Sequence, residues 1–259
     1  PHVHPPWPQL LIAAGRPSVG PALAVQRAAR GATISIQIQD PRIAVSNFDF
    51  VIPPSHDGLK GPNVLATLGA MHRVRTETLA AAALRWRARY AALPKPRLAV
   101  LVGGTSKHHR MTRAVAQRIG KTLKVLCAST GGSLMVTASR RSDLESQAAL
   151  QAALSDLPTD FWDGNGDNPY MGMLALADGI VVTEDSVTMA SEAGSTGKPV
   201  FIARMEGRSE KFAQFHNDLE VRGVSRPLTG AWDTWSYPPL FEAARVAAEI
   251  RRRVALPDA

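Results

Sequence analysis

Short apolar runs bounded by glycine or proline alternate with longer segments in which apolar residues recur at helical spacing. This alternation is typical of repeating βα units around a parallel sheet. The apolar runs predict strands at residues 9–14, 33–39, 48–52, 98–102, 133–138, 179–183 and 199–203. The helical spacing predicts helices at residues 18–30, 77–92, 111–120, 143–155, 169–177, 186–194, 209–219 and 239–254. We therefore expect an α/β protein with two doubly wound, Rossmann-like domains.

Two prolines, Pro94 and Pro96, interrupt the chain directly after the second predicted helix. Proline lacks a backbone N–H and ends helices, and a new strand begins just beyond this point. We therefore place a domain boundary here. The first domain covers residues 1–94 and is short by one βα unit, and the second domain covers residues 95–259.

The composition is that of a folded protein, with 45% apolar and 20% charged residues in a chain of 259. The single cysteine, Cys127, excludes an intramolecular disulfide and indicates a reducing compartment. No apolar run approaches the roughly 18–20 residues that cross a bilayer. His108, His109 and His216 lack metal-ligand spacing with acids, so we expect no metal. We expect a cytoplasmic protein, with the inner face of a membrane as an alternative location.

Charge is distributed unevenly along the chain. Residues 1–142 carry 20 basic and 4 acidic side chains, whereas residues 143–259 carry 10 and 18. A pI near 10.1 favours nonspecific attraction to nucleic acid. However, the sequence has no helix-turn-helix, no RNA-recognition signature and no alternation of basic and aromatic residues. We therefore expect no specific nucleic-acid partner.

The first junction that suits a ligand follows the predicted strand at 98–102, because ligands of open α/β sheets bind beyond the carboxyl ends of strands. Gly103 and Gly104 let the backbone approach an anion, and Thr105 and Ser106 offer hydroxyl donors before a helix begins. The spacing matches neither the dinucleotide nor the P-loop motif. A glycine-rich turn without a ligand is the alternative.

Two further loops contain groups that suit a nucleotide. Ser139, Arg140 and Arg141 follow the strand at 133–138, and adjacent arginines can clamp a diphosphate through bidentate hydrogen bonds. The alternative is a solvated pair of surface arginines. Asn168 lies in a loop rich in glycine, asparagine and aspartate, whose backbone groups can contact a planar base. A plain connecting turn is the alternative there.

A fourth junction joins a strand to a helix. Thr183, Asp185 and Ser186 form a strand end and a helix N-cap with exposed amides, which suits phosphate. Ser191 and Glu192 follow inside the helix, and the Glu192 carboxylate can accept hydrogen bonds from both hydroxyls of a ribose. The alternative is a helix cap followed by an exposed helical acid.

Two loops of the first domain suit the acceptor side of a cleft, and they contain Gly15, Arg16, His56, Asp57, Lys60 and Asn63. Binding and catalytic groups often collect in such loops. A histidine titrates near pH ~6.5 and suits proton abstraction from a hydroxyl. His56 and Asp57 are therefore the candidate catalytic base, with a structural or solvent-facing histidine as the alternative.

Several stretches together resemble the mitochondrial fission ELM family, whose plant and bacterial members have a fold similar to the two-domain GT-B glycosyltransferases. The resemblance extends from about residue 10 to 240. The matching residues are 14–16, 39–42, 48–51, 54–58, 63–70, 102–104, 139–141, 168–170, 182–189, 191–193 and 197–200. Arginine supplies 23 of the 30 basic residues, and we favour a bacterial member.

The resemblance implies a nucleotide-sugar donor in the C-terminal domain, with Gly103 and Gly104 near the phosphates and Glu192 on the ribose. It implies a metal-independent reaction with no cofactor, because basic residues and helix ends neutralise the diphosphate. It also implies that the last helix, 239–254, crosses back to the N-terminal domain. Family members usually begin with a further βα unit carrying a glycine-rich loop, which this sequence lacks.

The leading hypothesis is therefore a GT-B-like protein that binds a nucleoside-diphosphate sugar in the interdomain cleft and transfers the glycosyl group. A sugar-nucleotide epimerase is the second enzyme hypothesis. The rival class is a non-catalytic adaptor on an anionic membrane surface, a lipid or a partner protein, since plant family members are linked to mitochondrial division. The basic side chains that motivate it are Arg73, Arg75, Arg85, Arg87 and Arg89.

Overall fold

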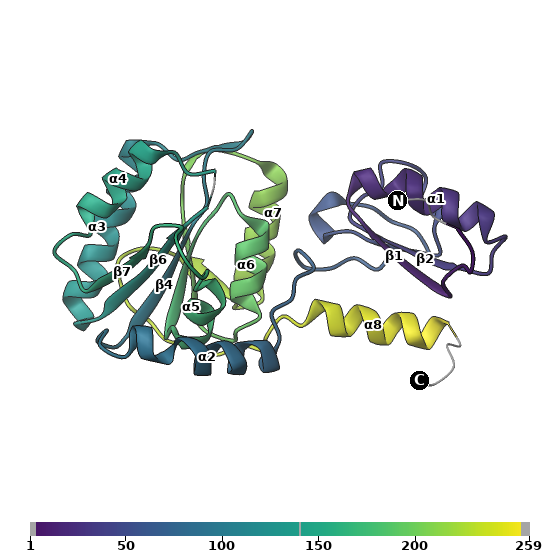
Figure 1. Ribbon diagram of the computed structural model, residues 1–259. Coiled ribbons are helices and arrows are strands. Elements are labelled where there is room, and N and C mark those ends of the chain that lie inside the picture. Colours follow the sequence, from purple (N-terminus) through teal and green to yellow (C-terminus); the bar gives the residue numbers. More distant parts are fainter. Residues whose placement is uncertain (1–3, 140, 255–259) are drawn as a thin grey trace. The chain divides into compact units, whose positions relative to one another are not determined.

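The computed structural model describes residues 4–139 and 141–254 (Figure 1). The chain divides into two compact units. The first combines Pro1–Met71 with Glu242–Ala259, and the second is His72–Phe241. Each unit is built around a parallel sheet with helices on both faces (Figure 1).

The first unit has a three-stranded sheet in the order β1-β2-β3. Its strands are β1 (Leu10–Ala14), β2 (Ile34–Ile38) and β3 (Phe50–Ile52), and its helices are α1 (Val19–Ala28) and α8 (Glu242–Arg253). Successive side chains of a strand point to opposite faces of the sheet. Ile36 and Ile52 therefore pack in one apolar cluster with Val246 of α8, whereas Val51 packs with Ala22 of α1 on the other face.

The second unit has a six-stranded parallel sheet in the order β11-β9-β8-β4-β6-β7. Its strands are β4 (Arg97–Val102), β6 (Ser133–Ala138), β7 (Thr159–Trp162), β8 (Gly179–Thr183), β9 (Val200–Ala203) and β11 (Ser225–Pro227). Central strands β4 and β8 are almost entirely apolar because both faces of the sheet are covered. The connections from β4 and from β8 run in opposite directions across the sheet. This switch point is where open α/β sheets bind ligands.

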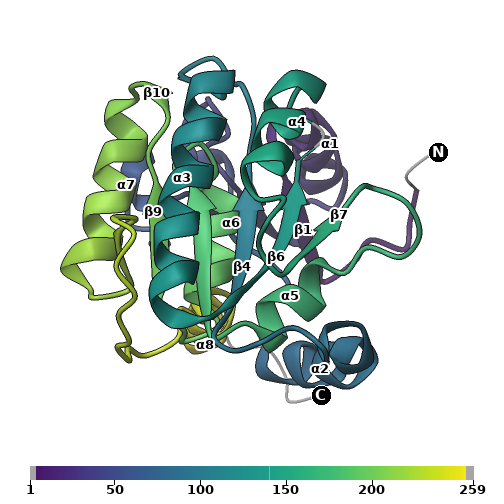
Figure 2. The ribbon, with the colours of Figure 1, turned by 90° about the vertical axis from the view of Figure 1, so that its left-hand side faces the viewer.

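Helices cover both faces of this sheet. They are α3 (Arg113–Thr130), α4 (Leu144–Ala153), α5 (Tyr170–Leu176), α6 (Val187–Gly194) and α7 (Glu210–Val221), and α2 (Thr76–Tyr90) packs against α5. Figure 2 looks onto α3 and α4, which lie in front of the sheet and share its main apolar core. Side-chain caps at Thr112, Asp143, Ser186 and Ser209 begin α3, α4, α6 and α7. A small antiparallel pair, β5 (His109–Arg110) with β10 (Glu206–Gly207), flanks the start of α3.

The compact units divide the chain at Met71, whereas the sequence placed the boundary at residue 94. The difference arises from α2, which packs against α5 of the second unit. The ring of Trp86 lies against Gly172, where an added Cβ would come within 2.4 Å of it. Arg89 forms a bidentate ion pair with Asp160. The helix before the prolines therefore belongs to the second unit.

The second unit differs from the sequence expectations in the end of one helix and in two additional strands. Helix α3 continues to Thr130, because Gly120 allows close packing on α4 instead of ending the helix. A Cβ at Gly120 would lie 2.5 Å from that of Ala153. Strands β7 and β11 were not expected, since both are short and interrupted by polar residues or proline. Within the described residues, none of the helices is both long and apolar enough to span a bilayer.

Candidate functional site

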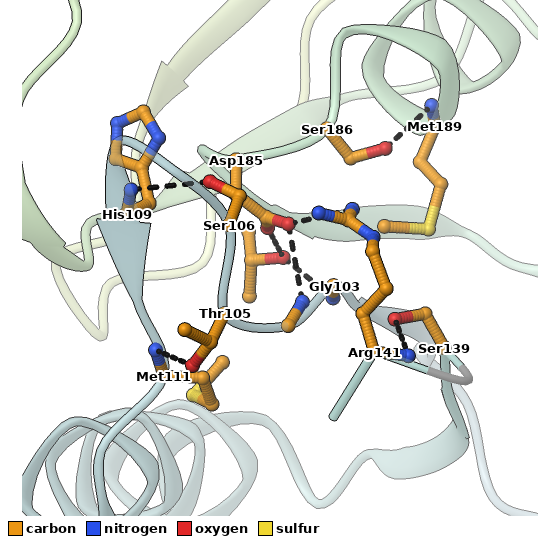
Figure 3. Close-up of polar contacts among 12 residues, drawn as sticks. Gly103, Thr105, Ser106, His109, Met111, Ser139, Arg141, Asp185, Ser186 and Met189 are labelled. Atoms are coloured by element: carbon orange, nitrogen blue, oxygen red, sulfur yellow. Dashed lines mark hydrogen bonds and ion pairs between the residues drawn. The ribbon is translucent and has the colours of Figure 1, made fainter. Parts of the chain in front are cut away.

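The predicted nucleotide-site residues of the second unit converge at the carboxyl ends of β4, β6 and β8 (Figure 3). Gly103 and Gly104 follow β4, and Ser139 and Arg141 follow β6. Thr183 ends β8, and the loop after it leads into α6. Arg140, which the sequence also assigned to this site, lies outside the described residues.

Asp185 is the centre of this cluster. Its side chain has 0% exposure and accepts a hydrogen bond from the Thr183 hydroxyl at 2.7 Å. It also accepts from the Gly104 amide at 3.1 Å and from the Arg141 guanidinium at 2.9 Å. The Thr183 hydroxyl in turn accepts from the Gly103 amide at 2.7 Å. The buried carboxylate therefore holds the ends of three neighbouring strands together.

The two glycines are required by this packing. A Cβ at Gly103 would lie 2.0 Å from an Asp185 oxygen, and one at Gly104 would lie 2.2 Å from the backbone of Arg141. Both glycine amides donate within the protein. From the sequence we expected this loop to contact an anionic ligand. In the structure the loop contacts an anion of the protein itself, the Asp185 carboxylate, through the Gly104 amide.

Arg141 combines a fixed and an accessible part. One guanidinium nitrogen pairs with Asp185, while the side chain remains 47% exposed. The Arg141 amide donates to the Ser139 hydroxyl at 3.2 Å, and the next residue, Ser142, donates its hydroxyl hydrogen bond to the Gly103 carbonyl. A guanidinium has five N–H donors. Arg141 can therefore contact an anionic ligand while it stays paired with Asp185.

The start of α6 provides backbone donors. The Ser186 hydroxyl accepts from the Met189 amide at 3.2 Å and caps the helix. The amides of Val187 and Thr188, in the first turn, donate to no other described residue. The N-terminus of a helix carries a partial positive charge and exposed N–H groups. This end of α6 can therefore bind an anion.

Glu192 lies farther along α6 and is partly buried. It accepts a hydrogen bond from the hydroxyl of Tyr170 at the start of α5. Burial raises the pKa of Glu192, and the Tyr170 hydrogen bond lowers it by less. Burial and the neighbouring Glu192 also raise the pKa of Tyr170. Glu192 is thus a carboxylate without a cationic partner among the described residues.

The remaining predicted polar residues of this unit shape its loops. The Thr105 hydroxyl accepts from the Met111 amide at 3.2 Å, and the Ser106 hydroxyl accepts from the His109 amide at 3.1 Å. The Asn168 side chain accepts from the Tyr170 amide at 2.9 Å, at the beginning of α5. The Ser191 hydroxyl donates to the Val187 carbonyl at 2.7 Å within α6.

The acceptor-side residues all belong to the first unit. Gly15 has φ +79 and precedes a 3-10 turn, η1 (Arg16–Ser18). His56 and Asp57 lie in a second 3-10 turn, η3 (Ser55–Asp57), which ends at Gly58 with φ +71.

Two further acceptor-side residues differ in their surroundings. The Asn63 amide donates to the Val45 and Phe48 carbonyls at 2.8 Å each, next to the 3-10 turn η2 (Val45–Asn47), so this side chain fixes a loop. Lys60 is exposed.

The catalytic role of His56 or Asp57 stays a prediction. Within residues 4–139 and 141–254, no three His, Cys, Asp or Glu side chains are grouped as metal ligands would be.

A family model described as Mitochondrial fission ELM1 matches residues 1–254. The chain belongs to the mitochondrial fission ELM1 family. The curated Mitochondrial fission protein ELM1 of Arabidopsis thaliana is 36% identical to it over 275 residues, which cover 96% of this chain and 64% of that protein. This ELM1 family member therefore spans less than two thirds of the length of that relative. The expected family is confirmed.

Solved structures establish the fold of this ELM1 family member. UDP-GlcNAc 2-epimerase from Methanocaldococcus jannaschii matches with a TM-score of 0.56 at 11% identity, over 95% of this chain and 77% of that one. The epimerase from Neisseria meningitidis, bound to UDP-GlcNAc, matches with a TM-score of 0.50 at 12% identity, over the same shares. At such identities the likeness concerns the fold alone. The expected GT-B-like α/β class with Rossmann-like units is confirmed.

Sequence reasoning missed the interactions that organise this ELM1-family site. Asp185 was expected as a helix cap or a phosphate-site residue, and its ion pair with Arg141 joins residues 44 positions apart. The Tyr170 to Glu192 hydrogen bond likewise joins two helices. The only local signal was the position of these polar residues at strand ends. That signal identifies the edge of the sheet but not the pairs that form there.

Proposed function

We propose that this protein binds a nucleoside-diphosphate sugar at the carboxyl ends of β4 and β8. One observation carries the proposal. A half-exposed arginine, Arg141, and two helix amides with no acceptor among the described residues, Val187 and Thr188, surround the switch point of a Rossmann-like sheet. Donors of this kind neutralise phosphate without a metal. The Neisseria epimerase, which is bound to UDP-GlcNAc, supports the ligand class.

Helix α6 would span the ligand from diphosphate to ribose. Its first amides would bind the diphosphate together with Arg141. Glu192 lies five residues beyond Val187, or about 7.5 Å along the helix axis. That rise would place the Glu192 carboxylate beside the ribose hydroxyls. Tyr170 would orient the carboxylate through the hydrogen bond that it donates.

The reaction that we propose is metal-independent glycosyl transfer, with His56 or Asp57 as the base for an acceptor hydroxyl. Epimerisation of the nucleotide sugar is the second enzyme candidate, because the two solved structures described above are UDP-GlcNAc 2-epimerases. Product analysis separates the two. An epimerase converts the nucleotide sugar when no acceptor is added, whereas a transferase requires the acceptor.

An adaptor role is the alternative from another class, and the name of the Arabidopsis relative supports it. Two of its five motivating arginines are already paired on the surface of the second unit. Arg85 binds Asp167 at 2.5 Å and Arg89 binds Asp160 at 2.8 Å. Lipid binding would therefore depend on Arg73, Arg75 and Arg87. Sedimentation with anionic vesicles that is lost on replacing these three, and kept in Arg141→Lys, would favour the adaptor.

Calorimetric titration with UDP, GDP, UDP-GlcNAc and GDP-mannose tests the binding proposal. Arg141→Lys keeps the charge but cannot form bidentate hydrogen bonds with a phosphate, and we expect the affinity to fall by about tenfold. Glu192→Gln weakens the bonds to ribose and lowers the affinity by a similar factor of about ten. The matched controls are Arg113→Lys and Glu77→Gln, at exposed positions on α3 and α2.

Binding in the control variants should equal that of the wild type. The proposal fails if none of the four nucleotides binds the wild-type protein at millimolar concentration. It also fails if the variants at Arg141 and Glu192 bind as tightly as the controls.

A further inference from the structure

Asp185 places a negative charge inside the site proposed for the nucleotide. Its side chain has no exposure, so neither water nor salt reaches the carboxylate to screen it. Its hydrogen-bond donors are the Thr183 hydroxyl, the Gly104 amide and Arg141. Among these three, Arg141 supplies the positive charge. The local charge is therefore balanced before any ligand arrives.

The segment around Asp185 is acidic. Residues 179–197, which include β8 and α6, contain Glu184, Asp185 and Glu192 and no lysine or arginine. Glu184 is itself buried, with its carboxylate accepting from the Met205 amide and facing Arg204 at 3.5 Å. Among the described residues, a phosphate that approaches the start of α6 therefore meets three carboxylates, and the two guanidinium groups near them, Arg141 and Arg204, are already paired with Asp185 and Glu184.

This charge distribution distinguishes two classes of diphosphate. A free nucleoside diphosphate ends in a phosphate monoester, which carries about −1.5 to −2 at pH 7 because its second pKa is about 6. In a nucleotide sugar the same phosphate is esterified and carries one negative charge. Asp185 offsets the positive charge of Arg141, so each additional negative charge on a ligand within several ångströms of this carboxylate lowers affinity by about tenfold or more.

We propose that Asp185 makes the site selective for nucleoside diphosphates whose terminal phosphate is esterified, as in a nucleotide sugar, over the free nucleoside diphosphate. The inference rests on the proposed function and adds to it. Asp185 positions the guanidinium of Arg141, and its own negative charge opposes the extra charge of a free diphosphate. It is therefore a positioning and specificity residue. The same selectivity favours release of the free nucleoside diphosphate after the reaction, because the site binds it more weakly than the incoming nucleotide sugar.

The test compares affinities for UDP-GlcNAc and UDP in one preparation. In the wild type we expect UDP-GlcNAc to bind about tenfold more tightly than UDP at pH about 7.5, with the ratio falling as the UDP monoester gains a proton near pH ~6. The other charged groups near Asp185 are Arg141, Glu184, Arg204 and Glu192, and each of them acts on both ligands. This measurement needs no variant.

Asp185→Asn then removes the charge at nearly constant size. We expect the ratio of the two affinities to fall toward one, because UDP gains relative to UDP-GlcNAc. If Asp185 only supported the fold, its substitution would lower the affinity for both ligands equally and leave the ratio of the two affinities unchanged. Asp156→Asn, at an exposed ion pair with Lys124, is the control and should keep the wild-type ratio.

Two failures are distinguishable. Absence of binding by UDP, UDP-GlcNAc, GDP and GDP-mannose alike in the wild type overturns the proposed function itself. Binding of both ligands with equal affinity, or with a preference that does not change with pH and persists in Asp185→Asn, leaves the nucleotide site standing and overturns the selectivity inference.

Discussion

Two acidic side chains on either side of the first turn of α6 have opposite surroundings. Asp185, before the helix, is fully buried and bonded to an arginine, an amide and a hydroxyl. Glu192, inside the helix, is partly buried with a phenol as its hydrogen-bond donor, and its pKa is raised. A buried carboxylate with a cation and two further donors holds structure together, whereas one without a cation keeps a capacity to exchange partners. The comparison separates the structural frame around Asp185 from Glu192, the residue that we propose contacts the ribose.

The sharpest way to break this comparison is Asp185→Ala. The change leaves the Gly104 amide and the Thr183 hydroxyl without an acceptor, and Arg141 without its counter-charge. We expect the free energy of unfolding to fall by about 2–4 kcal/mol. Urea denaturation measures it, and Asp156→Ala, at an exposed ion pair, should show little change. A loss no larger than that of the control would remove Asp185 from the structural frame.

Gly103→Ala tests the same frame from the side of the loop. The added methyl would overlap the Asp185 carboxylate, with only 2.0 Å between the two. We expect a loss of about 1–3 kcal/mol in the free energy of unfolding. Gly20→Ala in α1 is the matched control, because nothing lies within 4 Å of its Cβ position. That helical substitution should stabilise the first unit by about 0.5–1 kcal/mol. Equal tolerance at both glycines would contradict the packing.

Glu192→Gln has the smallest expected effect on stability, and its sign depends on pH. The pKa of Glu192 is raised in the folded state, so the native protein takes up a proton before the unfolded chain does as pH falls. Relative to Glu192→Gln, the wild type should therefore gain stability as pH falls through the folded pKa toward the unfolded value of about 4.5.

The measurement for Glu192 is a series of urea titrations across the acidic range. The difference between wild type and Glu192→Gln should shrink or reverse in favour of the wild type as the carboxyl group becomes protonated. A difference that stays constant with pH would mean that burial does not perturb this carboxyl group.

Local sequence patterns predicted much of the fold for physical reasons that can be traced. Ser186 and Asp143 cap the helices that were expected to begin there, and the apolar run of β8 matches the expected strand, residues 179–183. The helix predicted at residues 111–120 ended at Gly120, where the missing side chain instead allows close contact between α3 and α4. The same residue type marks a true end at Gly131, where φ is +66. Composition alone does not distinguish these two uses of glycine.

Sequence analysis predicted where the candidate site lies on the sheet but not which of its residues form hydrogen bonds with one another. Strand ends identified Gly103, Thr183 and Asp185, since parallel strands finish at the same edge of a sheet. Their hydrogen bonds join residues about 80 positions apart, which no local pattern encodes. Sequence reasoning therefore located this edge of the sheet, but it did not predict that Thr183 and Asp185 accept the hydrogen bonds of the Gly103 and Gly104 amides.

A crystal structure with UDP-GlcNAc tests the central claim most directly. We predict diphosphate density within hydrogen-bond distance of the Val187 and Thr188 amides and of the Arg141 guanidinium, with ribose hydroxyls on Glu192. Asp185 should remain paired with the glycine loop. Density for the nucleotide elsewhere on the protein, or none at saturating ligand, would contradict the account.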